Sequence, residues 1–319
     1  MSSKPVGVLF MAYGSPNTPA EIPGYLADIR GGRPTPSHIV EEIADHYRKI
    51  GLEAAGYGPE YADSSPLLTI TRRQVEGTAR LLGAERFRCY MGMRHWSPWI
   101  EDAVAQMIDD GITQAVGIVL APHYSRMSVE RYRERVSDAL QMFHASIDFF
   151  HVDSYHEAPG LIDALARSVA AGLGRWPGSE RNSVHVVFSA HSLPERILKE
   201  GDPYQRQLWR TAELVAEKAG LPRERWSWSY QSAGKSPEPW LGPQLEDYVP
   251  ELARRGIRNV LCVPVGFISD HVEILYDIDI EAQRAARESG VRLERPPAVN
   301  DDSAFLASLA DTIRAAVAK

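Results

Sequence analysis

The feature that most restricts the fold of this chain is that it repeats itself. Gly111-Ile112 begins a segment that includes Val-Gly-Ile-Val-Leu-Ala-Pro, and Gly256-Ile257 begins a similar segment 145 residues later that includes Val-Leu-Cys-Val-Pro-Val-Gly. Further pairs match in the same order: Glu101-Asp102 with Glu246-Asp247, Pro98-Trp99 with Pro239-Trp240, and Val8–Pro16 with Val186–Pro194. Shared patterning can produce a single match, but several in one order indicate a duplicated fold.

Each half of the chain reads as strands alternating with helices. Strands are predicted where short apolar runs are continuous: Val6–Met11, Arg86–Met91, Ala115–Leu120, His185–Ser189, Trp226–Tyr230 and Asn259–Val265. Such runs are typical of parallel sheets that are covered on both faces. Amphipathic helices are predicted at Pro36–Ile50, Thr69–Leu82, Glu101–Asp110, Pro159–Gly172 and Tyr204–Ala219.

The alternation predicts an α/β fold of two similar doubly wound, Rossmann-like domains with parallel sheets. The predicted domains are residues 1–150 and 151–319, and a closing helix at Phe305–Ala318 can pack back on the first. Because ligands of such sheets bind beyond the carboxyl ends of the strands, we expect an active-site cleft between the two halves.

Composition excludes several classes of protein. The net charge of −7 leaves no basic footprint for nucleic acid or for an anionic membrane. The two cysteines, Cys89 and Cys262, lie in apolar runs and cannot build a disulfide framework. No stretch reaches the roughly 18 apolar residues that span a bilayer, and the N-terminus does not read as a signal peptide. We therefore expect a soluble, cytoplasmic protein. Dinucleotide-binding and serine-hydrolase motifs are absent.

His191 is the first candidate functional residue. It directly follows a predicted buried strand, in the motif Ser189-Ala-His-Ser-Leu-Pro194, whose proline stiffens the turn. A ring held there would point into the site. The alternative is a histidine that only caps the next helix.

The second motif is acidic and begins at Gly266, which permits a sharp exit from a strand. Glu273, Asp277 and Glu281 are spaced by four residues, which places them on one face of a helix. Like charges at this spacing cost roughly 0.2–0.5 kcal/mol per pair, a cost that a shared cation would reverse. The alternative is a solvated acidic face near a helix N-terminus.

Tyr13 occupies the position of His191 in the repeat, which would place a phenol and an imidazole on equivalent loops. A buried core phenol is the alternative. The loops Met93–Trp96 and Tyr230–Pro243 follow the predicted strands Arg86–Met91 and Trp226–Tyr230 and add aromatic and basic groups to the rim. Exposed aromatics there would suit a planar ligand, although they can also be core residues.

Together these motifs resemble the ferrochelatase family. The resemblance is carried by Ser189–Pro194, by Tyr230-Gln-Ser with Pro239–Pro243, and by Gly266–Asp277, and it covers nearly the whole chain. It implies a chelatase-like fold and a lyase of haem biosynthesis that inserts ferrous iron into a porphyrin. Such an enzyme distorts the macrocycle and removes two pyrrolic protons.

The resemblance also implies roles for these residues. His191 and Glu273 match the family's catalytic and metal-site pair, and Asp277 and Glu281 match carboxylates proposed to conduct metal or protons. We expect His191 to act as a neutral imidazole. We expect Asp277 and Glu281 to raise the pKa of Glu273 by like-charge repulsion. His271 is expected to support Glu273 from outside the ligand set.

Within the family the chain looks like the bacterial branch that uses coproporphyrin III. Met11-Ala-Tyr13-Gly matches that branch, where the tyrosine is the axial ligand of the product iron on the opposite face. No apolar membrane lip is visible between Gly31 and Thr69. The residues that resemblance assigns to the substrate are Arg30, His46, Tyr47, Ser65 and Tyr132. Two departures are His46, where an arginine is common, and a Leu52–Asp63 insertion at the mouth.

The resemblance implies no tightly bound cofactor, because Fe²⁺ is a substrate. Cys89 and Cys262 alone cannot hold the C-terminal iron–sulfur cluster of some relatives. The expected partners are the porphyrin and ferrous iron, without nucleic acid or membrane insertion. We expect a monomer with transient contacts to neighbouring enzymes of the haem pathway.

Three alternatives stay open. One is a protoporphyrin IX ferrochelatase. Another is a cobalt or nickel chelatase for sirohydrochlorin-like tetrapyrroles, which shares the duplicated fold. The third is a non-catalytic haem-binding protein that holds porphyrin through Tyr13 and would need neither Glu273 nor the carboxylate ladder.

Overall fold

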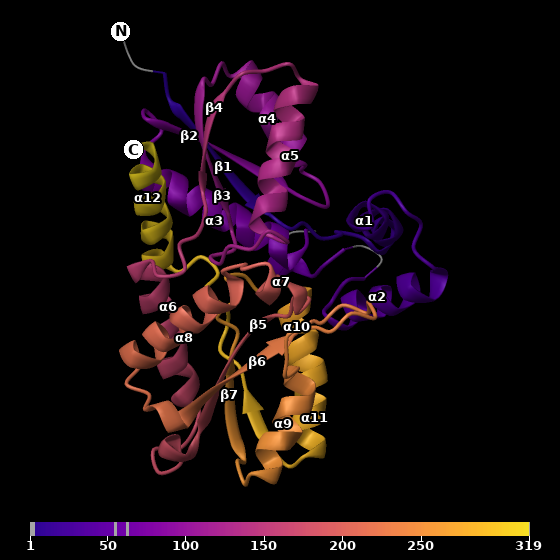
Figure 1. Ribbon diagram of the computed structural model, residues 1–319, viewed down its shortest axis with the longest axis vertical. Coiled ribbons are helices and arrows are strands. Elements are labelled where there is room, and N and C mark those ends of the chain that lie inside the picture. The colour runs from indigo at the N-terminus through magenta and orange to yellow at the C-terminus, as the bar shows by residue number, and fades with distance from the viewer. Residues whose placement is uncertain (1–3, 54–55, 62–63, 319) are drawn as a thin grey trace. The chain divides into compact units, whose positions relative to one another are not determined.

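The computed structural model describes residues 4–53, 56–61 and 64–318 (Figure 1). The chain divides into two compact units, Met1–Tyr155 with Asp301–Lys319, and His156–Asn300. The predicted second domain runs to residue 319 with a closing helix that can pack back on the first domain, and the structure groups this C-terminal segment with the first unit. The predicted insertion at 52–63 lies partly outside the described residues. Within its described part, Glu53 pairs with Gly56 in an antiparallel bridge.

The first unit contains a parallel sheet in the order β2-β1-β3-β4. Its strands are β1 (Val6–Ala12), β2 (Phe87–Met93), β3 (Gln114–Val119) and β4 (Asp148–Val152). Its helices are α1 (Ile22–Ile29), α2 (Ser37–Lys49), α3 (Pro66–Leu82), α4 (Ile100–Asp109), α5 (Val129–Met142) and α12 (Ser303–Val317). Helix α3 packs against α12 and α4 against α5, so helices cover both faces of the sheet (Figure 1).

The second unit repeats this plan with a parallel sheet in the order β6-β5-β7-β8. Its strands are β5 (His185–His191), β6 (Trp226–Gln231), β7 (Asn259–Val263) and β8 (Arg292–Glu294). Its helices are α6 (Pro159–Leu173), α7 (Arg196–Lys199), α8 (Tyr204–Lys218), α9 (Leu245–Arg254), α10 (Val272–Leu275), a π-helix (Asp277–Ala282) and α11 (Gln283–Glu288). Helices α6 and α8 pack together, as do α9 and α11.

The structure confirms the fold class and shows how far the repeat extends. The two sheets have the same strand order, and the central strands β1 and β5 are apolar and buried along almost their whole length. The 145-residue offset carries α4 onto α9 and the first residue of β3 onto that of β7.

One predicted match within the repeat is wrong. Pro98 O accepts a hydrogen bond from Met93 N at 2.7 Å, and Pro243 O accepts one from Tyr230 N at 2.8 Å. The structural equivalent of Pro98 is therefore Pro243 and not Pro239. Pro98 and Pro243 are also 145 residues apart. The extra residues of the second copy therefore lie before Pro243, between the end of β6 and this proline.

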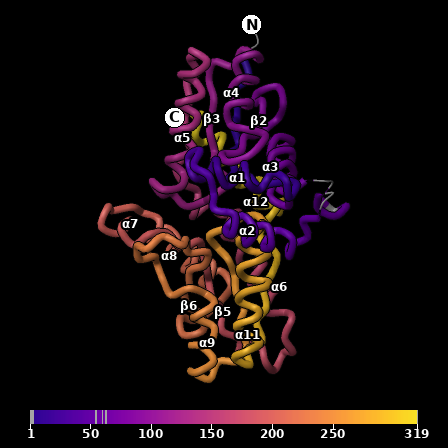
Figure 2. Tube along the Cα trace, turned by 90° about the vertical axis from the view of Figure 1, so that its right-hand side faces the viewer, coloured from indigo at the N-terminus to yellow at the C-terminus, as the bar shows by residue number. Residues whose placement is uncertain are grey.

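The C-terminal helix α12 completes the first unit. The Asp302 side chain caps the start of this helix by accepting hydrogen bonds from Ala304 N and Phe305 N at 2.9 and 3.2 Å. Leu306 packs where Gly77 of α3 has no side chain, because a Cβ there would lie 2.4 Å from Leu306 Cδ1. Helix α12 lies beside α3 (Figures 1 and 2).

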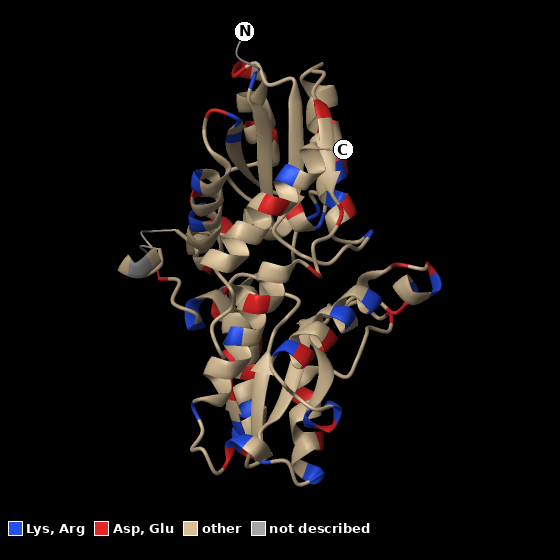
Figure 3. Ribbon diagram, turned by 90° about the vertical axis from the view of Figure 1, so that its left-hand side faces the viewer, with Lys and Arg blue, Asp and Glu red and all other residues tan. Residues whose placement is uncertain are grey.

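Along the ribbon of each unit, positions of Lys and Arg alternate with positions of Asp and Glu over the helices and loops (Figure 3). In the described part of the chain, no helix is both long enough and apolar enough to cross a membrane.

Two buried histidines, His95 and His185, and the half-buried His151 predict that the protein loses stability in acid. Burial lowers the pKa of His95, His151 and His185 to about 4. Because each pKa is near 6.5 in an unfolded chain, the unfolded state binds more protons between these values, and stability falls as the pH decreases. From pH 7 to pH 5 we expect a loss of about 1–2 kcal/mol per histidine.

Urea unfolding at the two pH values measures this loss. His185→Gln should flatten the pH dependence, whereas His38→Gln, at an exposed position, should not change it. Equal pH dependence in the His185 variant and the parent would contradict this interpretation.

Candidate active site

The second unit brings His191 and Glu273 into contact. His191 is the last residue of β5, and Glu273 is the second residue of α10. His191 Nε2 lies 3.3 Å from Glu273 Oε1, and each side chain is 31% exposed. Two residues that lie far apart in the sequence thus form a half-buried pair that a ligand can reach.

The charges of this pair stabilise one another. Burial disfavours the charged ring, but the Glu273 carboxylate raises the pKa of His191 to about 9. Burial would likewise raise the pKa of Glu273, but the His191 imidazolium, helped by His271, lowers it well below its usual range. At neutral pH the pair is therefore an imidazolium and a carboxylate.

These charges correct two expectations. The sequence predicted a neutral His191, whereas the ring holds a proton as long as Glu273 faces it. The sequence also predicted a raised pKa for Glu273, whereas the pKa of Glu273 is lowered and that of its neighbour Asp277 is raised. The physical reason is that a cation in contact with Glu273 outweighs the neighbouring carboxylates.

The Asp277 carboxyl titrates near neutral pH. Burial, together with repulsion from Glu273 and Glu281, raises its pKa to about 7, against a hydrogen bond donated by Ser232 Oγ. The backbone of Ser232 has a φ of 61°, in the left-handed region that non-glycine residues rarely adopt. A carboxyl with this pKa can both accept and release protons at the working pH of most enzymes.

The acidic ladder lies on a segment that is not a regular α-helix. After α10 the chain forms the π-helix Asp277–Ala282, in which Glu281 N donates to Tyr276 O at 3.0 Å. Ile274 and Ile278 are completely buried in the core of the second unit, which leaves the other side of the segment to the carboxylates. A π-turn within a helix is frequent at functional sites. The four-residue spacing predicted the ladder but gave no sign of this wider turn.

Two buried residues hold Glu273 in place from beneath. Gln231, the last residue of β6, donates from Nε2 to the Glu273 carbonyl, and Ser189 Oγ of β5 donates to Gln231 Oε1 at 2.8 Å. Tyr204 Oη donates to the His191 carbonyl at 3.1 Å. The sequence placed Gln231 in a rim loop, but it is 1% exposed and supports the site from inside.

His271 lies beside Glu273, as the sequence predicted. Its Nδ1 is 2.9 Å from the Ser269 carbonyl oxygen, so Nδ1–H donates there. Its Nε2 is 3.4 Å from Glu273 Oε2, while His191 faces the other carboxylate oxygen. Both oxygens of Glu273 thus meet an imidazole.

In the first unit, Tyr13 follows β1 directly and is 39% exposed, so it is not a core phenol. Its ring centroid lies 4.5 Å from that of His95. His95 is itself fixed, because Nδ1 lies 2.7 Å from Asp28 Oδ2 and its backbone N donates to Tyr13 O at 2.8 Å. The exposed phenol of Tyr13 therefore packs against an imidazole that is itself held in place by hydrogen bonds.

The predicted substrate residues of the first unit differ in exposure. Arg30 is exposed at the end of α1, and His46 is half-buried in α2, with Nε2 4.0 Å from Glu42 Oε1. Tyr47 and Tyr132 are buried. Ser65 is completely buried, and its side chain caps α3 by accepting a hydrogen bond from Leu68 N at 3.2 Å. A ligand could contact Ser65 only if the residues that cover it moved away.

Comparison with known proteins decides the family. A family model described as Ferrochelatase matches residues 5–317. The chain belongs to the ferrochelatase family. The resemblance that the motifs carried is confirmed, and this ferrochelatase is an enzyme that inserts a metal ion into a porphyrin.

Its relatives match over almost their whole length. A protein of Deinococcus radiodurans named Ferrochelatase is 55% identical over 98% of this chain and 96% of its own. A protein of Geobacillus kaustophilus named Coproporphyrin III ferrochelatase is 39% identical, with coverages of 98% and 96%.

A solved structure shares the fold of this ferrochelatase. The sirohydrochlorin chelatase SirB of Bacillus subtilis subspecies spizizenii, in complex with cobalt, matches with a TM-score of 0.57, covering 97% of this chain and 94% of that one. At 11% identity this likeness shows the fold alone.

Proposed function

We propose that this ferrochelatase inserts ferrous iron into coproporphyrin III. The observation that carries the iron site is the contact between His191 and Glu273, at 3.3 Å in a half-buried position. The substrate is supported by relatives named for coproporphyrin III at 37–39% identity and by Tyr13 after β1. The Deinococcus relative is named without its porphyrin, so the choice of ring belongs to the proposal.

The proposed iron site offers one nitrogen and one oxygen ligand. Donors of this kind hold Fe²⁺ only moderately, as a delivery site requires. Among the described residues, no three His, Cys, Asp or Glu side chains converge on a point that could hold a metal ion. With two protein ligands, positions stay available for water and then for the pyrrole nitrogens.

The reaction releases two protons, because Fe²⁺ replaces two pyrrolic hydrogens. His191 already holds a proton that Glu273 stabilises, and iron binding to Glu273 removes that stabilisation. His191 then gives its proton to water, which can reach the 31% exposed side chain, and the free imidazole serves as a ligand of Fe²⁺ or as a base for a pyrrolic proton. Asp277, with a pKa of about 7, is the proposed acceptor that passes protons on, with Glu281 next along the segment. The insertion transfers no electrons and needs no resident cofactor.

The first unit is proposed to recognise the ring. Tyr13, exposed and backed by His95, is the proposed axial ligand of the product iron. Arg30 and His46 offer exposed and half-exposed partners for propionates, with Tyr47 and Tyr132 behind the surface. Coproporphyrin has four propionates against two in protoporphyrin, so polar partners at the edge of the ring favour coproporphyrin.

Anaerobic assays of iron insertion into coproporphyrin III and protoporphyrin IX test this proposal. A site built for four carboxylates leaves polar groups unpaired when two are missing, and we expect kcat/KM to favour coproporphyrin III by about tenfold or more. Equal or better kcat/KM with protoporphyrin IX would reject the proposed ring. Faster insertion of Co²⁺ into sirohydrochlorin than of Fe²⁺ into either porphyrin would reject both ring and metal.

A further inference from the structure

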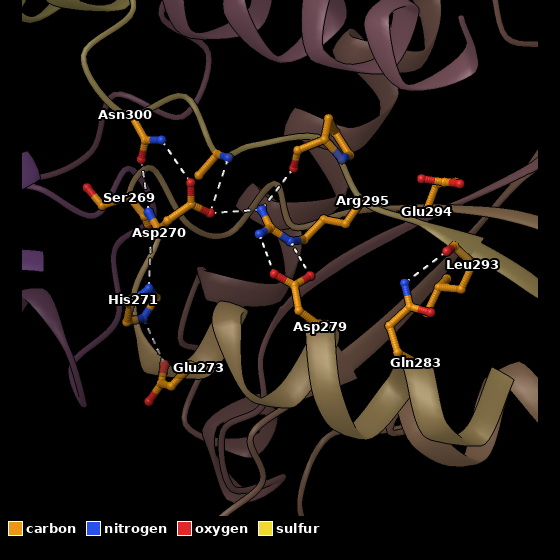
Figure 4. A network of polar contacts seen from close by, with 12 residues as sticks. Ser269, Asp270, His271, Glu273, Asp279, Gln283, Leu293, Glu294, Arg295 and Asn300 are labelled. Carbon is orange, nitrogen blue, oxygen red and sulfur yellow. Dashed lines mark hydrogen bonds and ion pairs between the residues drawn. The ribbon is translucent and has the colours of Figure 1, made fainter. Parts of the chain in front are cut away.

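Arg295 is a buried arginine that follows β8 and bridges two carboxylates of the second unit (Figure 4). Its side chain is 9% exposed. Nε and Nη2 donate to the two oxygens of Asp279 at 2.7 and 2.6 Å, and Nη1 donates to Asp270 Oδ1 at 2.8 Å. The planar guanidinium suits such a two-sided bridge, which a lysine ammonium cannot reproduce.

The two carboxylates stand on either side of the residues that hold the proposed chemistry. Asp270 lies in the loop just before α10, and Asp279 lies in the π-helix. Glu273 and Asp277 lie between them in the sequence. Arg295 therefore links the two ends of the segment 270–279 through hydrogen bonds.

The Asp270 end of this bridge is fixed in turn. Asn300 Nδ2 donates to Asp270 Oδ2 at 2.8 Å, and Asp270 N donates to Asn300 Oδ1 at 2.9 Å (Figure 4). One peptide further on is His271, whose Nε2 lies 3.4 Å from Glu273 Oε2. Contacts therefore run without a break from Arg295 through Asp270 and His271 to Glu273.

The stretch needs such a bridge for two physical reasons. Residues 273–281 carry Glu273, Asp277, Asp279 and Glu281, whose charges repel one another in a short helical segment. The segment also winds as a π-helix, a rare conformation that is less regular than the α-helix around it. Arg295 neutralises Asp279 and anchors it, and removal of one partner from a buried network leaves uncompensated charge.

We propose that Arg295 is a positioning residue for metal insertion: by bridging Asp270 and Asp279 it holds the intervening turn so that Glu273 stays paired with His191. The inference rests on the proposed roles of His191 and Glu273. Arg295 sets where the Glu273 carboxylate stands and leaves porphyrin binding to other residues.

The test compares Arg295→Gln and Arg295→Lys with Arg292→Gln. Arg292 is the matched control, an exposed arginine of β8 that pairs with Glu294 through Nη2 at 3.0 Å. We expect Arg295→Gln to lower kcat for iron insertion by about tenfold to a hundredfold, because small misplacements of a reacting group have effects of this size. The Kd for porphyrin, measured by fluorescence titration, should stay within about twofold of the parent. The kcat of Arg295→Lys should lie between that of Arg295→Gln and that of the parent, and the kcat of Arg292→Gln should equal that of the parent.

Hydrogen exchange gives a second readout that does not depend on activity. In Arg295→Gln the amides of residues 272–282 should exchange faster, while those of β5, β6 and β7 keep their protection. Asp279→Asn removes the negative charge that Arg295 pairs with. If the Arg295 variants do not fold, the same measurements of kcat and hydrogen exchange are made on Asp279→Asn, with the same expected changes.

The outcomes separate this inference from the proposed function. Parental kcat in Arg295→Gln, while Glu273→Gln is inactive, would overturn the inference and leave the proposed function standing. Full activity of Glu273→Gln would instead remove the proposed function. Parental activity in Arg295→Lys, or faster exchange across all three strands together with lost porphyrin binding, would also overturn the positioning role.

Discussion

Replacing His191 with alanine is expected to lower the rate of iron insertion by about two to four orders of magnitude while porphyrin still binds. The substitution removes the proposed nitrogen ligand and the only imidazole that faces Glu273 Oε1 among the described contacts. It also leaves the half-buried Glu273 carboxylate without the cation that lowers its pKa. The metal then loses a proposed ligand, and the pyrrolic protons lose a proposed base, while Asp277 remains as the proposed acceptor that passes protons on.

Single-turnover insertion with saturating Fe²⁺ measures this effect, and porphyrin fluorescence measures binding. The matched control is His185→Gln, at the other end of the same strand β5, which should keep the parental rate. A His191→Ala enzyme that turns over like the parent would contradict the proposed site.

Adding one methyl group at Gly266 is expected to destabilise the second unit and to impair the site. A Cβ at Gly266 would lie 2.3 Å from Ala190 Cβ and 2.8 Å from Ala190 Cα, and the latter is backbone of the central strand β5. Gly266 N also donates a hydrogen bond to Ser189 O of β5 at 3.1 Å. The turn at Gly266 therefore cannot move away from β5 without loss of this hydrogen bond. Overpacking of this kind costs about 1–3 kcal/mol.

Because Ala190 precedes His191, the displaced chain should also move the imidazole. We therefore expect Gly266→Ala to lower the thermal midpoint and to reduce the rate by more than the loss of folded protein explains. Gly178→Ala is the control, since nothing lies within 4 Å of its added Cβ. Parental stability and rate in Gly266→Ala would contradict the close packing of the turn at Gly266 against strand β5.

The parts of the fold that could be predicted are those with a strong periodic signal. Buried strands such as β1 and β5 are continuous apolar runs, and helix α6 follows the expected range within one residue. The edge strands β2 and β6 were predicted, but β4 and β8 were not, because β4 is only half-buried and carries Asp148 and His151, and β8 has three residues. Helix α9 contains Pro250, which conceals its helical pattern.

Some features of the candidate site could likewise be predicted from the sequence, and others could not. His191 stands out as a polar residue at the end of an apolar strand, and Glu273, Asp277 and Glu281 stand out by their four-residue spacing. The structure brings His191 and Glu273 into contact, and their roles in the reaction stay predictions. Charge states were not predictable, since they depend on which oxygen of Glu273 meets which ring. Gln231 and Arg295 escaped notice because their roles come from hydrogen bonds to residues remote in the sequence, such as Ser189 and Asp270.

The common strand order of the two units has a consequence for how the enzyme can change. Tyr13 and His191 stand at corresponding positions of two copies of one architecture, yet one is a phenol and the other an imidazole with a carboxylate partner. The residues that orient His191 and Glu273 all belong to the second copy. On the proposed roles, mutation can therefore change the choice of tetrapyrrole in the first copy, while the pair His191 and Glu273 that is proposed to deliver iron is inherited unchanged in the second.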